Sequence, residues 1–250
     1  MSETFWLSDE QFCRLQPLLP TDTRGVARVD DRRVISGIVH VLKTGGRWVD
    51  VPSIYGPRKT LYNRYVRWAA KGIWANIFHA LVTTGGPPAD VLIDSSAVKA
   101  HRCASGGKRG KTQAIGRSRG GRTTKIHALS DDLGRPLRLM LTGGHVADCT
   151  AANALLEGLP ANLMVHGDKG YDSNAVRHQI EAQGCVPNIP PKSSRKWKNC
   201  FSPHLYRCRN AIERMFARLK DFRRIATRYD RLACNYLAAV HIAATVCYWL

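Results

Sequence analysis

The hydrophobic pattern changes at residues 83–88, and this change constrains the fold more than any other feature of the chain. Before it, apolar residues recur at helical spacing, as in the stretch DEQFCRLQPLL behind Ser8. After it, short apolar runs such as VLI at 91–93 alternate with helical stretches. The residues at the change, TTGGPP, are typical of a linker. We therefore predict a helical part over residues 1–82, a linker over 83–90 and a mixed α/β part over 91–250.

The mixed part has the order β-β-β-α-β-α-β-α. Strands are predicted over 91–93, 123–129, 136–142, 163–165 and 185–189, and helices over 149–158, 174–183, 205–225 and 233–249. A polar turn at 131–134 joins the second and third strands as a hairpin. This order predicts the α/β ribonuclease H-like fold, in which a mixed five-stranded sheet carries helices on both faces.

The helical part ends in a basic helix that follows a turn. The turn is Gly56-Pro57, and the helix is predicted over residues 59–70. Its exposed positions are expected to carry Arg58, Lys59, Arg64 and Arg67. A short helix, a turn and a basic second helix resemble a helix-turn-helix, so we expect a small all-α DNA-binding domain in which Lys59, Arg64 and Arg67 contact DNA. The alternative is an ordinary helical bundle with solvated basic residues.

The charge of the chain indicates a polyanionic partner. Lys and Arg total 38 against 19 Asp and Glu, a net charge of +19, which favours nucleic acid. Residues 99–125 hold nine Lys or Arg and no acid, so we predict a flexible basic loop that lies along a phosphate backbone. A solubilising loop is the alternative. The candidate DNA contacts in this loop are Lys108, Arg109, Lys111, Arg117, Arg119, Arg122 and Lys125.

The cysteines and the start of the chain indicate a cytoplasmic protein. None of the eight cysteines forms a C-x-x-C pair, which favours reduced thiols over disulfides. The first residues lack the pattern of a signal peptide, and no apolar stretch is long enough to span a membrane. Zinc at Cys200, His204 and Cys208 is a weak possibility that stays open, because a fourth ligand is missing nearby and Pro203 interrupts the segment.

Two acids follow apolar runs that should be neighbouring strands. Asp94 comes directly after 91–93, and Asp168 follows residues 163–167. A carboxylate at the end of an apolar run is costly to bury unless it is paired or binds metal. Adjacent strand ends form ligand sites in such sheets, so the two carboxylates are expected to meet. Asp148 or Thr150 is expected to cap the helix 149–158, and Asp172 or Ser173 the helix 174–183, with the two acids preferred.

Glu213 is the candidate third acid. It lies on the predicted helix 205–225, whose apolar face would pack on the sheet. At about 100° per residue, four polar side chains fall within one arc of roughly 60° and form a stripe along the helix. They are Tyr206, Arg209, Glu213 and Lys220. Three acids of this kind could hold two Mg²⁺ or Mn²⁺ ions per site for phosphodiester chemistry, with the other three side chains contacting phosphates or orienting the acid. The alternative for Glu213 is a surface ion pair with Arg209.

The motifs together resemble the Asp-Asp-Glu transposases of bacterial insertion sequences, and most closely the "IS-five" group. The resemblance rests on Asp94-Ser95-Ser96, on Gly167-Asp168-Lys169-Gly170-Tyr171, and on the Tyr206, Arg209, Glu213 and Lys220 spacing. It extends to the WVDVP stretch at 48–52, to YNR at 62–64 and to residues 116–127, and so covers almost the whole chain.

The resemblance implies a catalytic domain with dependence on Mg²⁺, or on Mn²⁺, at Asp94, Asp168 and Glu213. It implies cleavage of double-stranded DNA at terminal inverted repeats and transfer into target DNA. Because two ends must be joined, a homodimer or larger assembly is expected, with no membrane partner. The alternatives are a catalytically silent DNA-binding repressor and a ribonuclease H-like nuclease that cuts without joining.

Overall fold

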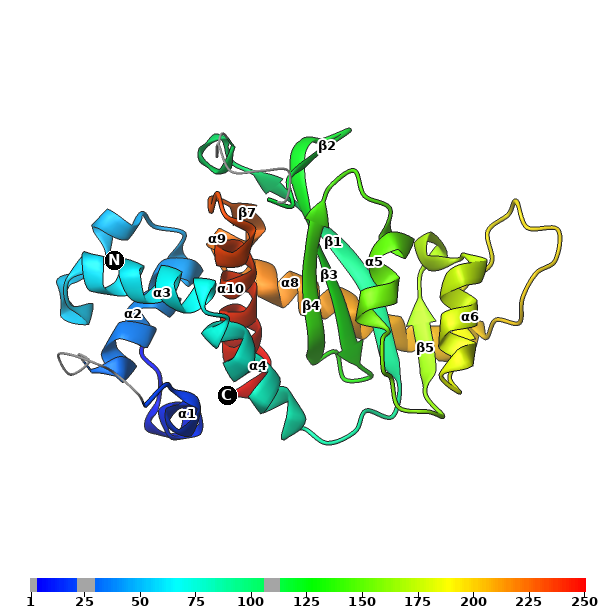
Figure 1. Cartoon of the computed structure of the whole chain (residues 1–250), viewed down its shortest axis with the longest axis horizontal. Helices are drawn as coiled ribbons and strands as arrows, with labels where there is room; N and C mark the ends of the chain where they lie inside the picture. Colours follow the sequence, from blue (N-terminus) through cyan, green and yellow to red (C-terminus); the bar gives the residue numbers. More distant parts are fainter. Residues whose placement is uncertain (1–3, 22–29, 106–112) are drawn as a thin grey trace. The chain divides into compact units, whose positions relative to one another are not determined.

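The structure is a computed structural model that describes residues 4–21, 30–105 and 113–250 (Figure 1). The chain folds into two compact units. The first unit consists of Met1–Thr84, His101–Gly107 and Leu219–Leu250, and the second of Gly85–Ala100 and Lys108–Arg218. No helix in the described ranges is both long and apolar enough to cross a membrane.

The first unit is helical. Its elements are α1 (Asp9–Leu15), α2 (Asp31–Thr44), α3 (Arg58–Ala70), α4 (Ile73–Thr83), α9 (Arg223–Ala226), β7 (Thr227–Arg228), α10 (Ala233–Ala244) and a π-helical turn at Thr245–Trp249. Short 3₁₀ turns lie at Gln16–Leu18, Trp48–Asp50, Ser53–Tyr55 and Arg102–Ala104. The helix predicted behind Ser8 is confirmed. Ser8 caps α1 in a capping box with Gln11, and α2 ends at Gly45, whose φ of 79° suits glycine.

Helix α10 packs against α2, α3 and α4 of the N-terminal region. It is apolar on most sides, with Tyr236, Ala239 and Val240 fully buried, so it must be covered on several sides. The Tyr65 hydroxyl donates a hydrogen bond of 2.6 Å to the Asn235 carbonyl. Helix α10 therefore belongs with the helical unit, whereas the predicted 91–250 domain placed it with the sheet. Hydrophobicity alone does not specify which elements cover a helix.

The predicted basic helix is α3, and three of its basic residues are exposed as expected. Arg58, Lys59 and Arg67 face solvent. Arg64, in contrast, forms an ion pair with Asp31, and its side chain is only 11% exposed. The expectation that Arg64 is exposed is wrong, because the acid at the start of α2 draws its guanidinium inward. The segment before the turn is a single 3₁₀ turn at Ser53–Tyr55, and DNA binding by this region stays a prediction.

The second unit contains the sheet. Its elements are β1 (Val91–Ala100), β2 (Gly116–Ser118), β3 (Gly121–Asp131), β4 (Pro136–Gly143), α5 (Asp148–Leu155), β5 (Met164–Gly167), a 3₁₀ turn at Lys169–Tyr171, α6 (Asn174–Ala182), β6 (Val186–Asn188), α7 (Pro203–Tyr206), a 3₁₀ turn at Arg207–Arg209 and α8 (Asn210–Lys220). The boundary between the two units falls near the end of α8. Five of the described strands form the core in the order β4-β3-β1-β5-β6.

The strand directions make the sheet mixed. β1 and β3 are antiparallel, as are β3 and β4, whereas β1 with β5 and β5 with β6 are parallel. On one face, Val91 and Ile93 pack with Leu155 of α5 and Ile180 of α6. Figure 1 shows α5 on the near side of the sheet and α8 behind it. The predicted ribonuclease H-like fold with a five-stranded mixed sheet is confirmed.

The predicted basic loop over 99–125 contains strand residues at both of its ends. β1 continues to Ala100, and β2 with β3 forms a hairpin over 116–123. The loop assignment is therefore wrong for this hairpin, because its Thr and Ser residues pair in a sheet that its basic composition did not reveal. Arg117, Arg119 and Arg122 are exposed on or beside the hairpin. The candidate residues Lys108, Arg109 and Lys111 lie outside the described residues.

Asp172 is a buried acid and does not cap α6, so the preferred one of the two predicted caps is wrong. Ser173 caps the helix instead. The Asp172 carboxylate accepts hydrogen bonds from Arg177 Nε (2.9 Å), Arg195 Nε (2.7 Å) and the backbone N–H of Lys192 (2.7 Å). Burial raises the pKa of Asp172, but these donors outweigh burial and lower its pKa to about 2.

Replacing this acid tests its contribution to stability. Because the pKa of Asp172 lies below its unfolded value of 3.8, the carboxylate stabilises the fold above pH 4, and this stabilisation disappears as the pH falls towards 2. We expect Asp172→Asn to lower the free energy of unfolding by roughly 2 kcal/mol at neutral pH and by progressively less between pH 4 and pH 2. Urea unfolding at several pH values measures this. A difference that stays constant down to pH 2 would contradict it, and Glu157→Gln, at an exposed position, is the control.

Candidate active site

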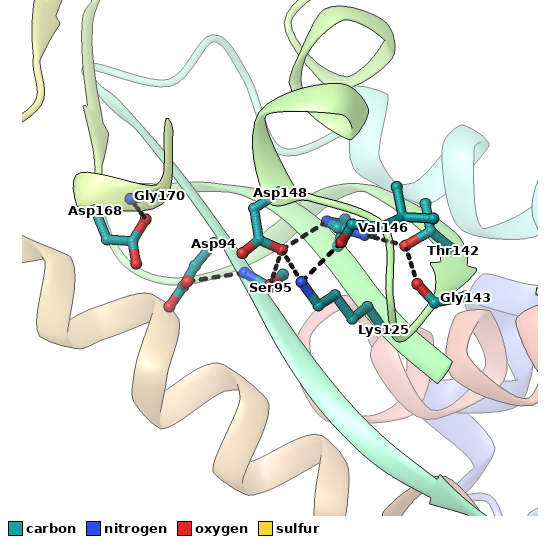
Figure 2. Close-up of polar contacts among 10 residues, drawn as sticks. Asp94, Ser95, Lys125, Thr142, Gly143, Val146, Asp148, Asp168 and Gly170 are labelled. Atoms are coloured by element: carbon teal, nitrogen blue, oxygen red, sulfur yellow. Dashed lines mark hydrogen bonds and ion pairs between the residues drawn. The ribbon is translucent and has the colours of Figure 1, made fainter. Parts of the chain in front are cut away.

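Asp94 and Asp168 lie side by side, although β1 does not end at Asp94 as predicted. The strand runs on to Ala100 in its pairing with β3, which the polar residues after Ile93 did not indicate. The parallel pairing of β1 with β5 does end here, and its last pair of residues is Ile93 and Gly167. The next residue on each strand is an aspartate, and Figure 2 shows the two carboxylates next to each other.

The environment of Asp94 disfavours its charge. Burial raises the pKa of the Asp94 carboxyl above its usual value, and the charge of Asp168 acts in the same direction. The backbone N–H of Ser95, at 2.8 Å from Oδ1, and the guanidinium of Arg209 oppose this rise without cancelling it. A half-buried acid beside a second acid is typical of a functional site, and it would gain from a cation.

Arg209 connects Asp94 to Glu213. Its Nη1 lies 2.8 Å from Asp94 Oδ2, and its Nη2 donates to Glu213 Oε1. The guanidinium also lies over the ring of Tyr206, 5.5 Å from its centre. The predicted stripe therefore does bring Tyr206, Arg209 and Glu213 to Asp94. Lys220 follows Glu213 by about two helical turns and is half-buried, and burial lowers the pKa of its ammonium.

The helix that carries this stripe is not continuous, so the prediction of one helix over 205–225 is wrong. Tyr206 ends α7, Arg209 lies in a 3₁₀ turn, and Glu213 is in α8. The backbone is extended at Phe222 before α9 begins. The apolar pattern could not reveal these divisions, because α-helical and 3₁₀ spacing differ little over three residues.

Asp148 is a site residue that the sequence analysis missed. It lies in the first turn of α5, but Ala147 is the N-cap residue, so the helix-cap prediction is wrong. Its Oδ1 accepts hydrogen bonds from Ser95 Oγ (2.6 Å) and from Lys125 Nζ (3.0 Å), as Figure 2 shows. Lys125 Nζ also donates to the Val146 carbonyl at 2.9 Å. Local sequence patterns do not mark this network, since Lys125 and Asp148 are 23 residues apart.

The charges of three aspartates act on the hydroxyl of Tyr171. Burial raises the pKa of the Tyr171 hydroxyl, and the charges of Asp148, Asp94 and Asp168 raise it further. Gly170 lies beside two of these carboxylates. A Cβ at this position would come within 2.9 Å of Asp168 Oδ1 and 3.5 Å of Asp148 Oδ2. The glycine thus keeps the space beside the acids open, whereas a side chain here would fill it.

The donor chemistry fits a divalent ion at Asp94 and Asp168. Mg²⁺ and Mn²⁺ prefer carboxylate oxygens, and both acids follow directly after the last residues of the β1–β5 pairing. Within the described ranges, however, no three His, Cys, Asp or Glu side chains converge closely enough to hold a metal ion. Glu213 is held by Arg209, so it can join the two aspartates only after leaving the guanidinium. Among the described residues, Cys200, His204 and Cys208 likewise do not form such a group.

Comparison with known proteins identifies the family of the chain. A family model described as "Transposase DDE domain" matches residues 85–250, and one described as "Putative transposase of IS4/5 family" matches residues 7–78. The "Putative transposase for insertion sequence element IS6501" of Brucella ovis is 36% identical over 129 residues, which cover 51% of this chain and 98% of that protein. The "Putative transposase for insertion sequence element IS402" of Burkholderia cepacia is 28% identical over 137 residues, 50% of this chain and 63% of that protein.

A solved structure also resembles the chain in part. It is the piggyBac transposase synaptic complex with hairpin DNA, at a TM-score of 0.43 and 11% identity. The match covers 74% of this chain but only 47% of the piggyBac chain, so this chain spans about half of that protein. Since the first family model covers more than half of the residues and includes all three candidate acids, the chain belongs to the family of DDE transposase domains.

Proposed function

We propose that this protein is a transposase that cuts DNA at the ends of an insertion sequence and joins the freed strands to target DNA. The observation that carries the proposal is the register of β1 and β5, which sets Asp94 and Asp168 side by side, with Glu213 reached through Arg209. The net charge of +19 and the exposed arginines of the β2–β3 hairpin support a DNA partner. Two DNA ends must be held together, so we expect a homodimer or larger assembly on DNA.

The residues of the site have separate roles in this proposal. Asp94, Asp168 and Glu213 would hold Mg²⁺ or Mn²⁺, two ions per site, which when bound supply charge neutralisation and activation of the attacking oxygen. Arg209, which pairs with two of these acids, exchanges these contacts for a DNA phosphate when the scissile strand enters. Its fork of donors matches phosphate as well as carboxylate. The ring of Tyr206 keeps the guanidinium in place during this exchange.

Cleavage of a labelled duplex with the element's own ends tests the proposal. With Mg²⁺ or Mn²⁺, we expect nicking at the end, and we expect Asp168→Asn and Glu213→Gln each to slow it by at least about a hundredfold, because each removes several kcal/mol of transition-state stabilisation. DNA affinity should persist in both variants. Glu157→Gln, an exposed carboxylate in the same unit, is the matched control.

The same assay separates the two alternatives. Binding without cleavage by the wild type would indicate the repressor, and cleavage without products joined to a target plasmid would indicate the nuclease. Equal cleavage by the wild type and both acid variants would mean that the active site lies elsewhere.

Lys125 offers a second test, because the sequence and the structure suggest different roles for it. The sequence predicts a DNA contact, whereas in the structure its side chain is only 19% exposed and its ammonium pairs with Asp148. We expect Lys125→Met to lower the cleavage rate about tenfold, through disorder of Asp148 and Ser95, with little change in DNA affinity. Arg122→Met, at an exposed hairpin position, should instead weaken binding and reduce the salt dependence by about one counterion. If Lys125→Met behaves like Arg122→Met, the positioning role is wrong.

A further inference from the structure

A loop between β6 and α7 exposes an aromatic ring among positive charges. In residues 189–201, the side chain of Trp197 is among the most exposed large apolar groups of the described chain, at 86%. Four basic residues and no acid accompany it, namely Lys192, Arg195, Lys196 and Lys198. Figure 1 shows the loop projecting beyond α6. Tryptophan is usually buried, so an exposed indole flanked by lysines suggests a binding surface.

Hydrogen bonds fix the loop at two places, so the backbone near the exposed Trp197 ring is held in position. At the neck, Asn188 Oδ1 accepts from the Ser202 N–H at 2.8 Å, and its Nδ2 donates to the Ser202 carbonyl at 3.2 Å. In the middle, Arg195 donates to the buried Asp172 at 2.7 Å and to Asn174 Oδ1 at 2.7 Å. Close ends and internal anchoring are the features of an Ω-loop. Holding the tip in place before binding reduces the entropy lost on binding.

The loop leaves the sheet on the side of the acids. β5 and β6 are parallel, with His166 opposite Asn188, so the carboxyl ends of both strands lie at one edge. Asp168 follows β5 at that edge, and the loop follows β6 there. The anchor Asp172 is four residues from Asp168. DNA held at the acids therefore passes on the side from which the loop projects.

We propose that loop 189–201 binds DNA beside the acids, with the ring of Trp197 stacked on an unpaired base and with Lys196 and Lys198 on the adjacent phosphates. The inference rests on the DNA binding of the proposed function and adds a recognition element to it. An indole matches the face of a nucleobase, and lysines match phosphates. The base must be unpaired, because the faces of paired bases are covered by their neighbours in the duplex. Cutting at an element's end is a step that can release such a base.

Fluorescence anisotropy with two labelled probes tests the inference. One probe is a blunt duplex, and the other is the same duplex with three unpaired thymidines at one 5′ end. We expect the wild type to bind the second probe about tenfold more tightly, since stacking contributes this much per base. Trp197→Ala should abolish the preference, and Trp197→Phe should retain part of it. Changing Lys196 and Lys198 together to Ala should weaken both probes and reduce the salt slope by roughly 2.

Controls separate this inference from the proposed function. Leu133→Ala removes another exposed apolar side chain of the same unit, 68% exposed, and should leave the preference intact. Thermal unfolding verifies that each variant is folded. If the wild type binds neither probe, the proposed function fails. If the wild type binds the duplex but shows no preference, or if Trp197→Ala keeps the preference, the stacking role is overturned while DNA binding stands.

Discussion

The parallel pairing of β1 with β5 is the constraint on which the candidate site depends. It ends at Ile93 and Gly167, so that the following residues, Asp94 and Asp168, lie just beyond the paired segment with their carboxylates adjacent. Because Val91, Leu92 and Ile93 are all fully buried, a shift of one residue would place the Asp94 carboxylate at a buried apolar position. The packing that stabilises the core therefore also fixes the distance between the acids.

Positive charge from two basic side chains balances the acids of the site. Arg209 pairs with Asp94 and Glu213, and Lys125 pairs with Asp148. Neighbouring carboxylates would otherwise repel one another at partly buried positions. In the proposed mechanism the arginine has a second use, since a guanidinium released from carboxylates is available for a phosphate. Ser95 links the two halves of the site, with its N–H on Asp94 and its hydroxyl on Asp148.

The buried carboxylate of Asp172 holds the surface loop 189–201 in place. Its carboxylate receives Arg177 from α6 and both Arg195 and the Lys192 N–H from the loop. A buried carboxylate with several donors is stable only when all of them are in place. The loop tip is exposed, yet its middle is attached to the core by this acid. In our proposal, that attachment presents the ring of Trp197 to DNA.

The sequence by itself determined the order of the five core strands, the ribonuclease H-like sheet, the paired aspartates and the stripe that carries Glu213. These follow from local periodicity and from acids placed after apolar runs, which are properties of neighbouring residues. Only the tertiary structure decided that Arg64 turns inward to Asp31, that α10 joins the helical unit and that Lys125 holds Asp148. It also decided that Asp172 anchors a loop instead of capping α6. Each of these depends on a partner distant in sequence, and local pattern specifies that a charge or an apolar face needs a partner without specifying which residue supplies it.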